Sequence, residues 1–201
     1  MTEADRTRRK LLEATLELIS LKGYHGATTR EIASRAGVSE LTLFRRFGKK
    51  EKLFEEMLRS FTFLPRLRDL IEDMEDEPLK ESLENIGVRF LQTLRLRSSL
   101  VKILLAEISR YPRQVRTIHQ QMIDNQARTL EGFLERRKGR GEIRPLDMNL
   151  PAYAFFRILF MTFLHESILA ERNMDDDRIE FIVGEVVETF LNGIASAGNE
   201  V

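Results

Sequence analysis

Apolar residues recur every three or four positions along most of this chain, which is the spacing of one face of an α-helix. The first such stripe consists of Leu12, Leu16 and Ile19, and it predicts a helix from about residue 5 to residue 21 that Gly23 ends. The alternation of apolar and polar positions that is typical of strands is absent. The pattern therefore predicts an all-α protein.

Residues 28–47 contain two short predicted helices joined by a tight turn. Thr28 can cap the first helix, and Glu31, three positions later, completes a capping box. Gly37 ends this helix, because glycine adopts a positive φ without steric cost. Ser39 can cap the second helix. The segment therefore predicts a helix-turn-helix.

The second of these helices, at about residues 40–46, has different inner and outer faces. Leu43 and Phe47 are one turn apart and are predicted to point inward. The outward positions are Glu40, Leu41, Thr42, Arg45 and Arg46. A short helix with threonine and arginine on its free side fits the major groove of DNA, although the pattern alone also fits a surface helical hairpin.

The sequence around this pattern, residues 23–54, reads GYHGATTREIASRAGVSELTLFRRFGKKEKLF. It has a Gly-aromatic turn, Thr-Thr at the first motif helix, Ala-Gly-Val-Ser at the corner and Thr-Leu-aromatic in the second helix. In these features it resembles the tetracycline-repressor (TetR) family of bacterial transcriptional regulators. The resemblance covers the first quarter of the chain. It implies an N-terminal three-helix DNA-binding domain at residues 1–48 and a C-terminal helical bundle for ligand binding and dimerisation at residues 49–201.

The resemblance also implies roles for individual residues. Those implied to hold phosphates or to clamp the DNA backbone are Thr29, Ser39, Arg46 and Lys50. Those implied to face base edges are Arg30 and Thr42. The other positions assigned to the DNA-binding surface are Thr28, Glu40, Leu41, Phe44 and Arg45.

Two of these residues depart from the family pattern. Phe44 stands where a tyrosine is usual, so one hydroxyl that could bond a phosphate is lost. Arg46 stands where a histidine is common, and it adds a permanently charged donor. We therefore expect phosphate binding to be retained.

Charge is unevenly distributed along the chain. The 32 basic and 32 acidic residues cancel overall, but residues 1–55 contain 12 Lys and Arg against 8 Asp and Glu, and the remainder contains 20 against 24. A local excess of positive charge is common on solvated surfaces, but it also agrees with a nucleic-acid partner, and a dimer would double it.

Composition narrows the remaining possibilities. The chain has no cysteine, which removes disulfides, thiol nucleophiles and cysteine-based zinc sites and fits a reducing cytosol. The N-terminus lacks the apolar run of a signal peptide. The longest apolar stretch, residues 152–164, is interrupted by Arg157 and is too short to span a bilayer. We expect a soluble, cytoplasmic protein that does not interact with a membrane.

Beyond the helix-turn-helix, the periodicity predicts several antiparallel helices in a bundle. One helix is expected from Lys50 to about Leu64, where Pro65 ends or kinks it. The following acidic stretch is expected to connect to a new helix at Pro78. A break at Ser98–Ser99 is expected to divide the next two helices.

The last two predicted helices, at about residues 151–169 and 179–194, are apolar over most of their circumference. A helix that is apolar on every side must be buried on every side, so one face needs a partner. We predict that both helices pair with their copies in a four-helix dimer interface, as the resemblance also implies. The predicted interface residues are Phe156, Phe163, Val183, Val187 and Leu191. A dimer would bind a palindromic operator.

The resemblance implies a ligand pocket inside the bundle, whose occupant relieves repression. Thirteen phenylalanines without a tryptophan would suit an apolar effector. The candidate lining residues are Phe61, Phe90, Leu94, Met122, Gln126 and Phe160. Taken singly, each apolar member also fits an ordinary core position.

Two other classes of protein are alternatives to a regulator. For an enzyme, the histidines His25, His119 and His165 lie in separate segments and no catalytic motif is present, so we predict no catalytic residue, metal or cofactor. His165–Glu166 and Asp175–Asp177 fit a polar pair and a helix start. An architectural DNA-binding protein stays open, and it would bind DNA without sequence preference.

Overall fold

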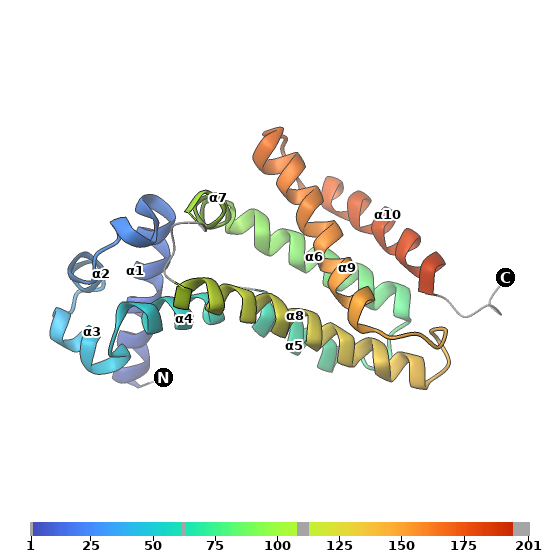
Figure 1. The fold of residues 1–201 in the computed structure, drawn as a ribbon, viewed down its shortest axis with the longest axis horizontal. Coiled ribbons are helices and arrows are strands. Elements are labelled where there is room, and N and C mark those ends of the chain that lie inside the picture. Colours follow the sequence, from blue (N-terminus) through green and yellow to red (C-terminus); the bar gives the residue numbers. More distant parts are fainter. Residues whose placement is uncertain (1, 62, 108–112, 195–201) are drawn as a thin grey trace. The chain divides into compact units, whose positions relative to one another are not determined.

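The computed structural model of the chain describes residues 2–61, 63–107 and 113–194, and within these residues the regular secondary structure is entirely helical (Figure 1). The all-α prediction is confirmed.

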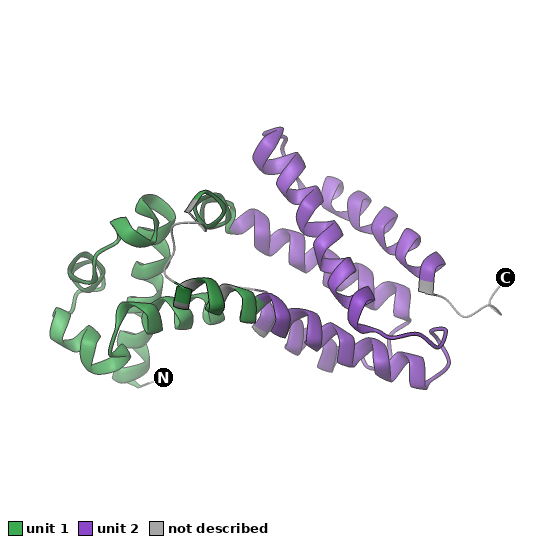
Figure 2. Cartoon of the chain, in the orientation of Figure 1, with its two compact units in different colours: residues 1–62, 97–122 green, residues 63–96, 123–201 purple. Residues whose placement is uncertain are grey.

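The chain forms two compact units, each built from two separate stretches of sequence (Figure 2). Unit 1 comprises Met1–Thr62 and Arg97–Met122, and unit 2 comprises Phe63–Leu96 and Ile123–Val201. Each compact unit therefore combines segments that are far apart in the sequence. The functional boundary at residue 48 stays a prediction.

Unit 1 is a helical cluster centred on its first helix. Its helices are α1 (Glu3–Gly26), α2 (Thr29–Arg35), α3 (Glu40–Phe47), α4 (Lys50–Phe61), α7 (Ser98–Glu107) and the first part of α8 (Arg113–Gly139). Helix α1 packs against α2, α4 and α7, and α2 packs against α3. The fully buried side chains between them include Leu11, Ile19, Ile32, Leu43, Leu53 and Phe54.

Helix α1 is longer than predicted at both ends. It begins at Glu3, because Thr2 and Asp5 form a capping box. The backbone leaves helical geometry at Gly23, with φ of 73°, and one further turn ends at Gly26. Gly23 was predicted to end the helix, and it instead breaks the helical geometry between two parts of α1, since a positive φ there favours glycine.

Unit 2 is a group of helices around an aromatic core. Its helices are α5 (Leu64–Asp73), α6 (Leu79–Leu96), the rest of α8, α9 (Asn149–Phe163), the π-helical segment η2 (Leu164–Leu169) and α10 (Asp176–Ile194). Helix α6 packs against α10, α9 and α5. The rings of Phe63, Phe90 and Phe156 meet edge to face, with centroids 5.0–6.1 Å apart.

Helix α5 was not predicted. Helix α4 was expected to reach Leu64 and to be followed by an acidic connection, but it ends at Phe61 and a new helix begins at Leu64. Pro65 occupies the first turn of α5, where its missing N–H costs nothing. Leu67 and Ile71, one turn apart, are buried and hold α5 in place.

A buried arginine ties the connection between α5 and α6 to α8. The Arg137 guanidinium donates to the carbonyl of Met74 at 2.8 Å and to that of Glu77 at 2.5 Å. It also pairs with Glu142 at 3.1 Å. Its charge is therefore compensated inside unit 2, which buried charge requires.

Helix α9 continues through η2 to Leu169, where the predicted helix was expected to end. The expectation that its apolar stretch is too short to span a bilayer is wrong by length and composition alone. Among the described residues, Asn149–Leu169 is the one helix whose length and composition would allow it to cross a membrane, and 33% of its most apolar window is buried. In η2, the buried Glu166 accepts hydrogen bonds from Arg178 at 3.0 Å and from Arg172 at 3.3 Å. The bond from Arg178 holds the pKa of Glu166 below its usual value.

Candidate nucleic-acid interface

Helix α2 begins with the predicted capping box. The Thr28 hydroxyl accepts a hydrogen bond from the Glu31 amide at 3.2 Å, and the Glu31 carboxylate accepts one from the Thr28 amide at 3.1 Å. The same carboxylate pairs with Lys22 of α1 at 2.7 Å. Hydrogen bonds from Lys22 and then from Thr28 lower the pKa of Glu31 to about 2. The start of α2 is thereby tied to the end of α1.

The turn between α2 and α3 is closed by backbone hydrogen bonds. Gly37 has φ of 72° and donates its amide to Ser34, and the Val38 amide donates to the Ala33 carbonyl at 3.0 Å. This is a Schellman arrangement, in which a left-handed residue after the helix satisfies its last carbonyls. Val38 packs against the core of unit 1. The predicted role of Gly37 is confirmed.

Helix α3 separates its two faces as predicted. Ser39 caps the helix by accepting a hydrogen bond from the Thr42 amide at 3.2 Å. Leu43 and Phe47 are 0% and 5% exposed, and burying each contributes about 1.5–3 kcal/mol. Leu41 on the other side is 69% exposed. The outer face of α3 is therefore free to meet a ligand.

Most of the side chains predicted to contact DNA lie at the surface of unit 1. Arg30, Arg45 and Arg46 are exposed, and none of them forms a salt bridge with a described residue. Phe44 is also exposed, and Thr42 shares a 2.9 Å hydrogen bond with Ser39. Three guanidinium groups without a salt bridge therefore remain available to phosphates or bases.

Two predicted phosphate contacts have partners inside the protein instead. The Thr29 hydroxyl donates to the Glu40 carboxylate at 2.6 Å, which links α2 to α3. The Lys50 ammonium donates to the Tyr24 carbonyl and lies 4.4 Å from the centroid of the Tyr24 ring. Burial lowers the pKa of Lys50. In the described structure, both side chains hold helices together.

Tyr24 is the residue that sequence reasoning missed. It is buried, and its ring centroid lies 5.2 Å from that of Phe54. The Lys50 ammonium lies over the face of its ring. Burial raises the pKa of its hydroxyl. The available signal was the aromatic residue that follows Gly23, because the break at that glycine turns the next side chain into the core.

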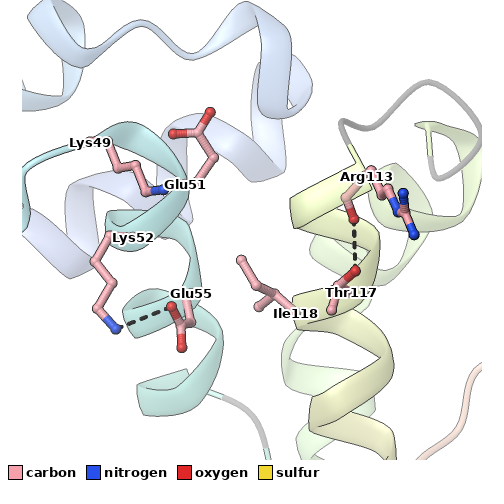
Figure 3. Close-up of a pocket in the computed structure, with 7 residues that line it drawn as sticks. All are labelled: Lys49, Glu51, Lys52, Glu55, Arg113, Thr117 and Ile118. Carbon is pink, nitrogen blue, oxygen red and sulfur yellow. Dashed lines mark hydrogen bonds and ion pairs between the residues drawn. The ribbon is translucent and has the colours of Figure 1, made fainter.

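Unit 1 also contains a hollow of about 310 Å³ between the starts of α4 and α8 (Figure 3). Its lining residues are Lys49, Glu51, Lys52, Glu55, Arg113, Thr117 and Ile118. Lys52 and Glu55 form a salt bridge of 3.2 Å across its α4 side. Five of its seven lining residues carry a charge, so it differs from the apolar pocket that was predicted.

None of the six predicted pocket residues lines this hollow. Phe61 and Met122 pack against the core of unit 1, and the remaining four belong to unit 2. Phe90 and Gln126 are buried there, whereas Leu94 and Phe160 are partly exposed. The pocket stays a prediction.

The predicted dimer-interface side chains point mainly into their own subunit. Phe163, Val183 and Val187 are fully buried within unit 2, Phe156 is buried in its aromatic core, and Leu191 is half-buried. Phe163, Val183 and Val187 have no exposed surface with which to meet a partner. The interface itself stays a prediction. The apolar side chains exposed on α9 and α10 are Leu150, Ile158, Met161 and Phe181.

The polar groups weighed for metal binding or catalysis have structural partners. Asp175 accepts a hydrogen bond from the Arg178 amide at 3.0 Å, and Asp176 pairs with Arg95 at 2.8 Å. The helix-start interpretation of this acidic run is confirmed. Across residues 2–61, 63–107 and 113–194, no group of three metal-ligating side chains is present. The side chain of His119 lies outside the described part of the chain.

The capped helix pair, its closed turn and the free basic face together define a helix-turn-helix DNA-binding protein. Residues 11–57 match the family described as bacterial regulatory proteins of the tetR family, and residues 81–193 match the C-terminal domain of AefR-like transcriptional repressors. The chain therefore belongs to the TetR family of transcriptional regulators, which are DNA-binding proteins and not enzymes.

Individual relatives agree with this assignment. The HTH-type transcriptional regulator YvkB of Bacillus subtilis is 29% identical over 200 residues, which cover 94% of this chain and 98% of YvkB. A TetR-family regulator from Mesorhizobium loti has a TM-score of 0.78 at 24% identity, over 98% of this chain and 100% of that one. The regulator FadR from Bacillus subtilis, solved with stearoyl-CoA, has a TM-score of 0.75 at 21% identity, over 92% and 98%. These two structures show that the fold is shared.

Proposed function

We propose that the protein is a cytoplasmic repressor that binds a palindromic operator as a homodimer and releases it when a small apolar effector binds in unit 2. The observation that carries the proposal is α3, which is capped at Ser39, buries Leu43 and leaves Leu41 and Arg45 free. A single eight-residue helix contacts too few bases for useful specificity. Two copies of α3 on one palindrome double the number of base contacts.

Within this proposal, the surface side chains divide into two kinds of DNA contact. Arg30 and Thr42 face base edges, and Arg45 and Arg46 contact bases or the backbone beside them. Lys50 acts mainly by positioning α4 against the end of α1, since its ammonium is bound to Tyr24.

The proposed dimer uses the exposed apolar stripe of α9 and the neighbouring Phe181 of α10. Leu150, Ile158 and Met161 lie on one side of α9, opposite the buried Phe155 and Phe163. Exposed apolar residues that form a stripe on one helix mark an interaction surface more often than isolated ones do. Burial of this stripe in the dimer would explain why so apolar a helix belongs to a soluble DNA-binding protein.

The proposed effector site rests on a buried polar group. Gln126 of α8 is 8% exposed and belongs to unit 2. In ligand pockets, a few polar groups among apolar side chains fix the orientation of the bound molecule, and a buried amide can supply one of them. The aromatic surroundings in unit 2 favour an apolar body for that molecule, and FadR, which shares the fold, was solved with stearoyl-CoA.

Selection of fragments bound from the source genome tests the proposal directly. We expect one palindromic sequence to be enriched, with an affinity that falls with rising salt, and cell extract to reduce the enrichment. Binding of all fragments alike would instead identify an architectural protein. Arg30→Ala should relax the preference at one base step in each half-site.

The oligomeric part of the proposal needs a separate measurement. The double variant Ile158→Glu/Met161→Glu should remain helical, elute at half the mass of the parent and bind the palindrome no more tightly than a half-site. Leu21→Glu, at a leucine of α1 that is 69% exposed, is the control and should stay dimeric. A double variant that remains dimeric would show that the stripe is not the interface.

A further inference from the structure

The hydrogen bond between Thr29 and Glu40 places a carboxylate at the first position of the recognition helix. The Thr29 hydroxyl donates to Oε1 of Glu40 at 2.6 Å, and both side chains are half-buried between α2 and α3. Oε2 of Glu40 makes no hydrogen bond to any residue that the structure describes. One oxygen is therefore fixed by the protein, and the other remains able to accept a hydrogen bond.

A carboxylate in a DNA groove has few favourable partners. Phosphates repel it, and the acceptor atoms of guanine and thymine offer it no hydrogen. Cytosine presents the N4 amino group as its donor, whereas adenine places the N7 acceptor beside its own amino group. In helix-turn-helix proteins, the N-terminal residues of the recognition helix contact base edges, and Glu40 is the first residue of α3.

We propose that Glu40, oriented by Thr29, selects cytosine at one position of each operator half-site. This inference rests on the proposed function, because it requires that α3 enters the major groove. Glu40 contacts the base, and Thr29 is a positioning residue that limits the carboxylate to one orientation. The use of the Thr29 hydroxyl by Glu40 also explains why this threonine is not free to hold a phosphate as predicted.

The test uses the full-length protein and the palindrome found by genomic selection, with each base pair varied in turn. For the parent chain, we expect one position per half-site at which cytosine is preferred by roughly 10-fold or more over the other bases. Glu40→Gln should move the preference at that position toward adenine, because glutamine pairs with the N6 and N7 atoms of adenine. Preferences at all other positions should stay unchanged.

Three further variants test whether a change in base preference comes from the Glu40–cytosine contact and not from altered charge or folding. Glu13→Gln removes one negative charge from α1, where Glu13 pairs with Arg9 of the same helix, and should leave every base preference unchanged. Thr29→Val should weaken the cytosine preference, whereas Thr29→Ser keeps the donor and should retain it. Circular dichroism should show equal helix content for all four variants.

The outcomes distinguish the inference from the function on which it rests. A parent chain that binds one palindrome, with a preference profile that Glu40→Gln does not alter, would overturn the cytosine assignment and leave the repressor proposal intact. A change at a position where the parent prefers a base other than cytosine would overturn it as well. A parent chain without any preferred sequence would overturn the proposed function, and this inference with it.

Discussion

The helix pair α2–α3 and the helix pair α9–α10 differ in how clearly their residues separate an inner face from an outer one. In α3, the buried positions are apolar and most outward positions are polar or charged. In α9, apolar side chains occur on both sides, so that Phe155 is buried while Met161 is exposed. Polarity therefore identifies the outer face of α3 but not that of α9.

The two pairs also depend on contacts of different range. The geometry of α2–α3 is set by caps and by a glycine turn, all within a few residues of one another. The inner face of α10 packs against α6, which lies roughly 100 residues earlier in the sequence, and against α9. Local chemistry can specify the first arrangement, whereas only the folded chain reveals the second.

The largest expected effect comes from placing a charge on the inner face of α10. Val187 is fully buried, so Val187→Glu should cost about 3–5 kcal/mol and remove helix content, as measured by circular dichroism. Phe181→Glu, on the outer face, is 60% exposed and should keep the helix content of the parent. If Val187→Glu folded normally and only abolished dimerisation, the assignment of the two faces would be reversed.

The same comparison within α3 pairs two leucines with opposite exposure. Leu43→Ala should lower the free energy of unfolding by about 2–5 kcal/mol, because it leaves a cavity in the core of unit 1. Leu41→Ala should change it by no more than about 0.5 kcal/mol while weakening operator binding. Urea unfolding and DNA titration measure the two effects. Equal losses of stability would contradict the separation of faces in α3.

The features set by local contacts could be predicted from the sequence, whereas those set by long-range contacts could not. The caps at Thr28 and Ser39 and the turn at Gly37 were predicted, because each depends on residues close in the chain. Phe163, Val183 and Val187 were predicted to face a partner but are buried within unit 2, since periodicity cannot say which apolar side of a helix packs inside its own subunit. Helix α5 was missed because Pro65 was read as an end when it was a beginning. Side-chain pairs such as Lys50 with Tyr24 depend on tertiary placement.

Alanine substitutions at two glycines, one in α6 and one in α10, should have effects on stability of intermediate size. A Cβ atom on Gly87 of α6 would lie 2.7 Å from Cγ1 of Val183, so Gly87→Ala should cost about 1–3 kcal/mol through overpacking. A Cβ atom on Gly184 of α10 meets no atom within 4 Å, and Gly184→Ala should stabilise the helix by about 0.5–1 kcal/mol. Thermal unfolding measures both changes. A stabilising Gly87→Ala would show that α6 and α10 pack less closely than described.

The smallest effect concerns the exposed carboxylate that ties α1 to α2. Hydrogen bonds from Lys22 and Thr28 lower the pKa of Glu31 to about 2, below its ordinary value of 4.5, so the folded state favours the charged form. The resulting stability is fully present above about pH 4.5 and is lost as the pH falls toward about 2. The melting temperature of Glu31→Gln should therefore lie below that of the parent at neutral pH, and the difference should shrink across this window. Lys22→Gln removes the largest cause of the shift and should move the loss of stability to higher pH. The difference in melting temperature between Glu31→Gln and the parent could instead be the same at both ends of the window. That result would show that the side chain acts through its shape and not through its charge.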